Sequence, residues 1–185
     1  MQRFKHFSIA AAYLYKQNQS NLSCSDHEAH FDLGVVLNPM FEKRYKRGED
    51  SYVAHPRFIC VCDGVGGWIR KLVDVGLFSK EFTRHINELY VKKQYSSLKD
   101  LLDSASKMTK AKGSSTCVMA ELTDSKTLST CNLGDSGYML FRPQPDGTTH
   151  FMFKSETQQH RFNAPYQTGT DKTWPTRAKS LSHEI

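Results

Sequence analysis

The residues best suited to chemistry lie in the run Cys60–Trp68, where an apolar stretch ends at Asp63 and is followed by a turn of three glycines. An aspartate at the end of a strand has fixed carboxylate oxygens, and glycine lets backbone carbonyls come close to a ligand. Hard divalent cations such as Mg²⁺ and Mn²⁺ prefer carboxylate, carbonyl and water oxygens. The run therefore fits a divalent-metal site, although an aspartate-glycine turn is also common without any ligand.

Further acidic residues are expected beside Asp63. Glu49 and Asp50 directly precede a strand that is expected to pair with the strand ending at Asp63, and Asp135 lies in another glycine turn between two strands. Clustered carboxylates without basic partners usually require a metal. Each signal is weak by itself, but together they favour a metal site.

Other chemistry of this region has simpler interpretations. Cys60 and Cys62 are typical small side chains of a buried strand, because a zinc site would need further ligands that the sequence alone does not bring to them. His85 and His160 are interpreted as surface or capping residues. The glycines do not match the P-loop motif. They do not match the dinucleotide fingerprint either, because this chain has Ile69 where that fingerprint has its last glycine.

The composition indicates a globular chain. Its 185 residues are 24% charged and 38% hydrophobic, which suits one domain with a core and excludes a disordered tail, a disulfide miniprotein and a collagen-like fibre. The five cysteines are an odd number in apolar segments, which disfavours a secreted disulfide framework. No apolar run approaches the roughly 18 residues of a membrane span.

The net charge of +6 is concentrated in residues 43–47 and 172–179. A basic excess fits nucleic acid, an anionic membrane or a phosphorylated substrate, as well as a solvated basic face. The basic residues are not interleaved with aromatic residues on one expected sheet face, so we expect no nucleic-acid binding.

Residues 1–28 are expected to be a targeting or disordered segment. No acidic residue precedes Asp26, whereas Arg3 and Lys5 stand before the apolar run Ile9–Tyr15. This pattern is typical of a mitochondrial presequence, and the absence of a small-residue cleavage site after the run disfavours a secretory signal. The sequence favours a mitochondrial location, with the cytoplasm as the alternative.

Residues 29–185 alternate between strand and helix patterns. Apolar residues at three- and four-residue spacing predict a helix from Gly76 to about Lys93 and a second helix over Leu98–Met108. Strands are expected at Phe31–Leu37, Ser51–Ala54, Phe58–Cys62, Cys117–Leu122, Thr127–Asn132, Tyr138–Arg142 and His150–Lys154. Strands, then a helical pair, then more strands are typical of an α+β fold with antiparallel sheets. Beyond Gly169 the pattern thins out.

Four motifs, in this order, resemble the metal-dependent protein phosphatases of the PPM, or type 2C, family: Gly48-Glu49-Asp50, Asp63–Trp68, Gly113–Thr116 and Asn132–Gly137. The Asp-Gly-Val-Gly-Gly-Trp form and the run Gln158–Gln167 resemble the branch that includes mitochondrial members. Because the motifs are ordered along residues 34–167, the resemblance outweighs the simple turn interpretation.

The resemblance implies a four-layer α-β-β-α sandwich, C-terminally incomplete here, with two Mg²⁺ or Mn²⁺ ions and a third, weaker one. It implies that Asp63 bridges both ions and that the Gly64 carbonyl binds one of them. It further implies that Glu49 and Asp50 hold metal-bound water, and that Asp135 helps to place the third ion. The implied activity is a protein serine/threonine phosphatase in which a metal-activated water attacks the phosphate ester. A phosphorylated protein is then the substrate, and we expect a monomer.

The chain departs from the family pattern in three places. Val65 stands where many members have a histidine that is a candidate general acid, and Tyr45 stands where an arginine often binds phosphate, which leaves Arg44 and Arg47 as candidates. Two further metal-binding aspartates of the family have no match before Ile185. The sequence therefore predicts a partial phosphatase domain or, alternatively, a catalytically silent PPM-like module that binds phosphoproteins or a partner.

Overall fold

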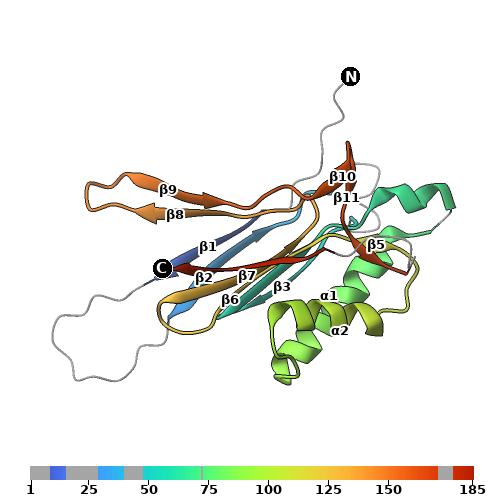
Figure 1. Cartoon of the computed structure of the whole chain (residues 1–185), viewed down its shortest axis with the longest axis horizontal. Helices are drawn as coiled ribbons and strands as arrows, with labels where there is room; N and C mark the ends of the chain where they lie inside the picture. The colour runs from blue at the N-terminus through green and yellow to red at the C-terminus, as the bar shows by residue number, and fades with distance from the viewer. Residues whose placement is uncertain (1–8, 16–28, 40–47, 72, 171–176) are drawn as a thin grey trace.

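The computed structural model describes residues 9–15, 29–39, 48–71, 73–170 and 177–185. In chain order the strands and helices are β1 (Ile9–Tyr15), β2 (His30–Val36), β3 (Ser51–His55), β4 (Phe58–Cys62), the short 3₁₀ helix η2 (Gly66–Lys71), α1 (Val75–Val91), α2 (Leu98–Met108), β5 (Ser114–Ser115), β6 (Cys117–Leu122), β7 (Thr127–Leu133), β8 (Met139–Pro143), β9 (Thr149–Lys154), β10 (Gln159–Arg161), β11 (Ala164–Pro165), β12 (Thr168–Gly169) and β13 (Lys179–Glu184). Figure 1 shows them as a β-rich body with both α-helices on one side.

The centre of the fold is a five-stranded sheet with the order β13-β7-β6-β4-β3, in which all neighbours are antiparallel. Strand β4 lies in the interior of this sheet, and its alternate residues Phe58, Cys60 and Cys62 are buried on one face. Side chains alternate between the two faces of a strand, so the neighbouring Ile59 points to the other face, where it packs in a separate cluster. The sheet is therefore covered on both sides.

Helices α1 and α2 cover one face of the sheet. Asp74 is the N-cap of helix α1, and its carboxylate accepts a hydrogen bond from the Gly76 N–H at 3.2 Å. Phe78, Phe82 and Ile86 recur every fourth residue and are fully buried in the main core. Helix α1 contacts β3 and β4, and α2 contacts β7. The apolar helix stripes thus form the core together with the inner face of the sheet.

The opposite face of the sheet carries a second β layer. Strands β1 and β2 form an antiparallel pair, and Phe31 of β2 packs with Leu122 and Leu128 of the central sheet. Strands β8 and β9 form a second ribbon, from which Leu140 joins the same cluster. In Figure 1 this ribbon extends away from the two helices. The described residues therefore form one helical layer, the central sheet and strands of a second β layer.

The seven strands and two helices that the sequence predicts are present, with bounds within a few residues of those expected. Strand β13 was not predicted, because Lys179–Glu184 contains a single large apolar residue, Leu181; it nevertheless pairs with β7 at the edge of the sheet. Strand β1 lies inside the segment 1–28, most of which is outside the described residues, so the targeting role of that segment stays a prediction. Neither helix of the described part of the chain is long and apolar enough to cross a membrane.

Candidate metal-binding site

The β3–β4 hairpin brings Asp50 and Asp63 together. In its register Ser51 pairs with Cys62, so the preceding residue, Asp50, lies opposite the following one, Asp63. The side chain of Asp63 is hydrogen-bonded to that of Asp50. Two acidic residues that are 13 positions apart in the sequence thus meet at one end of the sheet because the hairpin turn between them is tight.

The electrostatic surroundings of Asp63 include further acidic residues. The pKa of Asp63 is raised from its ordinary value of 3.8 to about 8, first by burial, then by the charge of Asp50 and the hydrogen bond to it, and then by the charges of Asp135 and Glu49. Each of these influences disfavours the ionised carboxylate. A bound divalent cation reverses that balance, because it is the largest local charge in such a site. The four acidic residues that the sequence singles out are therefore within electrostatic reach of one another.

The segment Gly113–Thr116 holds the backbone around Asp63. The Asp63 carbonyl accepts hydrogen bonds from the Thr116 N–H at 3.0 Å and from the Ser115 hydroxyl at 2.9 Å. The Val65 N–H donates to the Ser114 carbonyl at 3.0 Å, and Gly64 forms an isolated bridge with Ser115. Two of the motifs noticed in the sequence are thus joined by a short antiparallel contact that fixes the chain on both sides of Gly64.

The turn that carries Asp135 is fixed to this same segment. Gly134 has φ +103°, and a Cβ on it would lie 2.6 Å from the Thr116 side chain and 2.6 Å from the Tyr166 carbonyl, so only glycine fits. The Asp135 carboxylate accepts a hydrogen bond from the Gln159 side chain at 3.0 Å. The run Gln158–Gln167, which carries part of the family resemblance, therefore supports the Asp135 turn.

The start of helix α1 positions the pair Glu49 and Asp50. The Glu49 carbonyl accepts a hydrogen bond from the Ser79 hydroxyl, and the Gly48 carbonyl accepts one from the Lys80 ammonium at 3.4 Å. Gly48 has φ +76°, and a Cβ on it would lie 2.9 Å from Pro39. These contacts hold the backbone of the acidic pair. The hairpin then determines where its carboxylates lie.

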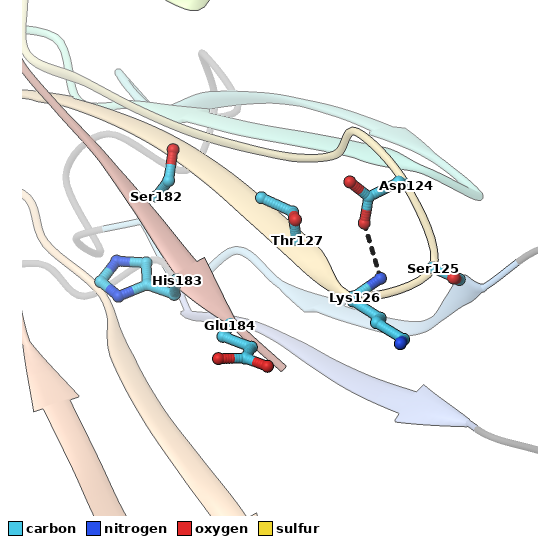
Figure 2. Close-up of a pocket in the computed structure, with 7 residues that line it drawn as sticks. All are labelled: Asp124, Ser125, Lys126, Thr127, Ser182, His183 and Glu184. Atoms are coloured by element: carbon cyan, nitrogen blue, oxygen red, sulfur yellow. Dashed lines mark hydrogen bonds between the residues drawn. The ribbon is translucent and has the colours of Figure 1, made fainter.

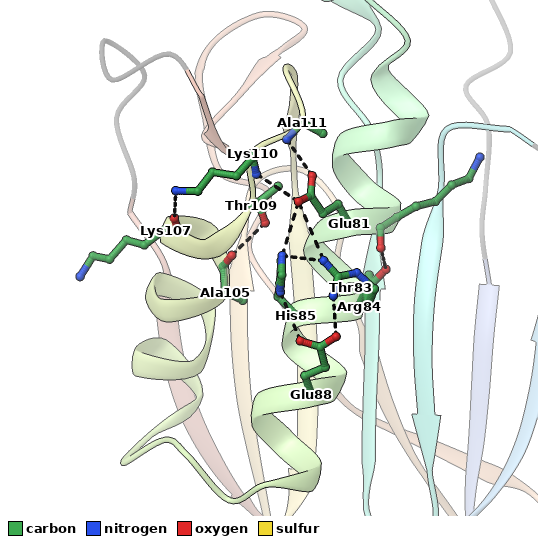
Figure 3. Close-up of polar contacts among 11 residues, drawn as sticks. Glu81, Thr83, Arg84, His85, Glu88, Ala105, Lys107, Thr109, Lys110 and Ala111 are labelled. Carbon is green, nitrogen blue, oxygen red and sulfur yellow. Dashed lines mark hydrogen bonds and ion pairs between the residues drawn. The ribbon is translucent and has the colours of Figure 1, made fainter.

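A polar cluster on α1 fixes the chain that leads into Gly113–Thr116 (Figure 3). The Glu81 carboxylate accepts hydrogen bonds from the backbone N–H groups of Ala111 at 2.7 Å and Lys110 at 3.3 Å. His85 lies between Glu81 and Glu88, with nitrogen to oxygen distances of 3.5 Å to each. The sequence interpretation of His85 as a surface or capping residue is wrong, because it is only 7% exposed. His160, in contrast, is exposed as expected.

Two features of the molecule lie apart from this cluster. Arg44 and Arg47 fall outside the described residues. A shallow hollow of about 510 Å³ is lined by Asp124–Thr127 and Ser182–Glu184 (Figure 2). It lies at the β6–β7 turn, which is the opposite end of β6 from Cys117 and hence from the Asp63 end of β4. The hollow therefore contributes nothing to the acidic site.

The donors of the acidic cluster fit a hard cation. Carboxylates and the nearby backbone carbonyls are the ligands that Mg²⁺ and Mn²⁺ use. In the described part of the chain, no three of these acidic side chains have oxygens within 4.8 Å of one another. The thiols of Cys60, Cys62 and Cys117 do lie that close together.

Comparison with known proteins identifies the family of the chain. The chain is 42% identical to "Probable protein phosphatase 2C 80" of Arabidopsis thaliana over 144 residues, which cover 72% of this chain and 32% of that protein. It is 36% identical to "Protein phosphatase PTC7 homolog fig" of Drosophila mojavensis over 143 residues, which cover 71% of this chain and 44% of that protein. Over these residues the chain belongs to the protein phosphatase 2C, or PPM, family.

The fold of this PPM chain is also that of a solved phosphatase. The structure titled "X-ray structure of the photosystem II phosphatase PBCP" matches with a TM-score of 0.71 and 24% identity, over 96% of this chain and 62% of that one. No family model matches the chain. The matched residues span only 32% and 44% of the length of the two curated relatives described above.

Proposed function

We propose that this chain carries the acidic end of the active site of a metal-dependent protein serine/threonine phosphatase. The observation that carries the proposal is the convergence of Glu49, Asp50 and Asp135 on Asp63, whose pKa is raised to about 8 by burial first and then by these neighbours. Structural ion pairs lower the pKa of a carboxyl, whereas carboxylates gathered at one point favour a cation. The names of the curated relatives support phosphate-ester hydrolysis as the chemistry of this site.

In this proposal the Asp63 carboxylate and the Gly64 carbonyl would hold the Mg²⁺ or Mn²⁺ ions. Glu49 and Asp50 accept hydrogen bonds from water at the ions, and Asp135 helps to hold a third, weaker ion. When bound, the two ions neutralise a phosphate ester and lower the pKa of a water molecule. The task of the protein is to keep the carboxylates in place, which the hydrogen bonds of Ser115 and Thr116 to the Asp63 carbonyl support.

Val65 cannot protonate the leaving group in this proposal. Its side chain is aliphatic and half-buried beside the acidic cluster, so it has no proton to donate at the position where many members have a histidine. We assign the proton that the departing serine or threonine alkoxide needs to water. Arg44 and Arg47 remain the proposed ligands of the substrate phosphate, because a guanidinium binds phosphate with two parallel hydrogen bonds.

The test measures Mn²⁺ binding and hydrolysis of a phosphothreonine peptide by the natural full-length protein and by its Asp63→Asn variant. We expect Mn²⁺-dependent hydrolysis that falls by at least about 100-fold in the variant, in line with the loss of a metal ligand. Asp32→Asn, which changes an exposed carboxylate of β2, is the control and should keep full activity. Hydrolysis that persists in Asp63→Asn, or that needs no metal, would refute the proposal.

The same experiment separates the phosphatase from the catalytically silent module. A silent module binds the phosphopeptide without releasing phosphate, and its binding does not change when Mn²⁺ is removed. We further propose a mitochondrial location, which the presequence-like pattern of residues 1–28 supports. Fractionation of cells that express the natural protein tests this, and recovery of the protein in the cytosol alone would contradict it. Size-exclusion chromatography with light scattering tests the expected monomer.

A further inference from the structure

Three cysteine thiols meet in the core behind the acidic site. The sulfur of Cys60 lies 3.6 Å from that of Cys62 and 3.7 Å from that of Cys117, and all three sulfurs lie within 4.8 Å of one another. The three side chains are free thiols with exposures of 1%, 0% and 0%. They form a closed group of soft ligand atoms, which we call the thiol cluster.

The register of the central sheet explains why the thiol cluster forms. Cys60 and Cys62 are two residues apart on β4, so they point to the same face. Strand β6 pairs with β4 such that Val61 lies opposite Val118, which puts Cys62 opposite Cys117. The sequence suggested no third ligand for the Cys-x-Cys pair because this ligand lies more than 50 residues away along the chain.

We propose that Cys60, Cys62 and Cys117 bind one soft d¹⁰ cation, Cu⁺ or Zn²⁺, in the core of the domain. Thiolates select these two ions over hard cations. A zinc ion binds sulfur at about 2.3 Å, so two sulfurs on one ion are roughly 3.8–4.0 Å apart in tetrahedral or trigonal geometry. The observed separations of 3.6 Å and 3.7 Å require an outward movement of only a few tenths of an ångström.

Charge balance defines the bound form. Cysteines bind metal as thiolates, so loading the three thiols releases three protons to solvent without electron transfer, and it leaves one net negative charge with Zn²⁺ or two with Cu⁺. Because the surrounding core is apolar and includes Phe78 and Phe82, the smaller net charge favours Zn²⁺ on electrostatic grounds. Three sulfurs without access to water suit Cu⁺, whereas Zn²⁺ usually takes a fourth ligand.

The thiol cluster is separate from the proposed phosphatase chemistry, although Cys62 directly precedes Asp63. Sulfur ligands do not compete for Mg²⁺ or Mn²⁺, and the carboxylates do not compete for Cu⁺. Zn²⁺ also binds carboxylates, so it is offered in the presence of excess Mg²⁺, which occupies the acidic site. The thiol site therefore stands or fails independently of the phosphatase function. Because the sulfurs are sealed from solvent, loading is expected during folding rather than by simple addition to the folded protein.

The experiment refolds the full-length protein with Zn²⁺, or with Cu⁺ under anaerobic conditions, in the presence of a phosphine reductant. After gel filtration, elemental analysis should find about one Cu or Zn ion per chain. Cys117→Ala should weaken the binding by at least about 100-fold, measured by competition with a chromophoric chelator. The matched control is Cys131→Ala, since Cys131 is also a buried free thiol but lies outside the thiol cluster; it should bind normally.

A second measurement does not depend on a folded variant. In metal-loaded wild-type protein, alkylation during gradual unfolding should modify Cys131 before the three clustered thiols, which the ion protects. Failure of the wild-type protein to retain either ion would overturn the proposal. So would an ion that persists in Cys117→Ala, or one that is lost equally in Cys131→Ala. Retention of Zn²⁺ or of Cu⁺ alone identifies which of the two the site takes.

Discussion

Replacing Asp63 by asparagine should stabilise the metal-free protein, although Asp63 is the proposed centre of the active site. The folded state pushes the pKa of Asp63 to about 8 through burial and through the negative charges of Asp50, Asp135 and Glu49. Ionising Asp63 in the metal-free protein therefore opposes folding. An asparagine has similar volume and carries no charge, so it removes this cost.

The sign and size of the effect follow from linkage. Between pH 3.8 and about 8 the folded state retains a proton on Asp63 that the unfolded state has lost, so the stability of the wild-type protein falls as the pH rises through this window and levels off above it. One pKa unit corresponds to about 1.4 kcal/mol, which sets an upper limit of about 6 kcal/mol. Local relaxation and water entry lower the cost of a buried charge, so we expect Asp63→Asn to be more stable by about 2–4 kcal/mol at pH 8.

The assay is urea unfolding in EDTA at several values of pH between 4 and 9, followed by circular dichroism. The stability difference between Asp63→Asn and the wild-type protein should be near zero at pH 4 and should widen up to pH 8. Asp32→Asn is the control and should show no such widening. A variant that is less stable than the wild-type protein at pH 8 would refute the electrostatic reasoning. Adding Mn²⁺ at 100 times its dissociation constant should stabilise only the wild-type protein, by about 2.7 kcal/mol.

Three further substitutions test the packing that positions the site, each by chemical denaturation. Gly134→Ala puts a Cβ 2.6 Å from its neighbours at φ +103° and should lower the free energy of unfolding by about 3 kcal/mol. Gly147→Ala is the control, because Gly147 has φ +81° with open space around it, and it should cost only about 1 kcal/mol. Equal costs would contradict the steric argument. Glu81→Ala leaves two backbone N–H groups without their acceptor and should cost about 1–2 kcal/mol. Phe82→Ala should cost about 3–5 kcal/mol, and Leu77→Ala, which is 59% exposed on the same helix, less than about 0.5 kcal/mol.

The sequence predicts the elements with strong periodicity and does not predict those held by long-range pairing. Helix α1 follows directly from the spacing of Phe78, Phe82 and Ile86, because each lies on one stripe that the sheet can bury. Strand β13 has a polar sequence and owes its conformation to the edge of β7, which no local pattern reveals. Tertiary context overrides local preference most easily in short strands.

The same distinction applies to the sites. The acidic residues were predicted because each lies in a glycine turn or beside a strand end, where the local sequence is informative, and their closeness to one another then follows from the hairpin. The burial of His85 was not predicted; this residue lies beside Glu81, whose carboxylate binds the distant backbone of Lys110 and Ala111. The contact of Cys117 with Cys60 was not predicted either, because it depends on the pairing of β6 with β4.

One strand register determines both proposed metal sites. With Val61 opposite Val118, the thiols of β4 and β6 share the helix-facing side, and Asp63 leaves the strand where Thr116 can bond its carbonyl. A slip of one residue would turn every side chain of β4 to the other face, which would expel the cysteines from the core and move Asp63 away from Asp50. Any cation held by the thiol cluster would cross-link β4 to β6 in the correct register, and would thereby also favour the arrangement of carboxylates at the end of β4.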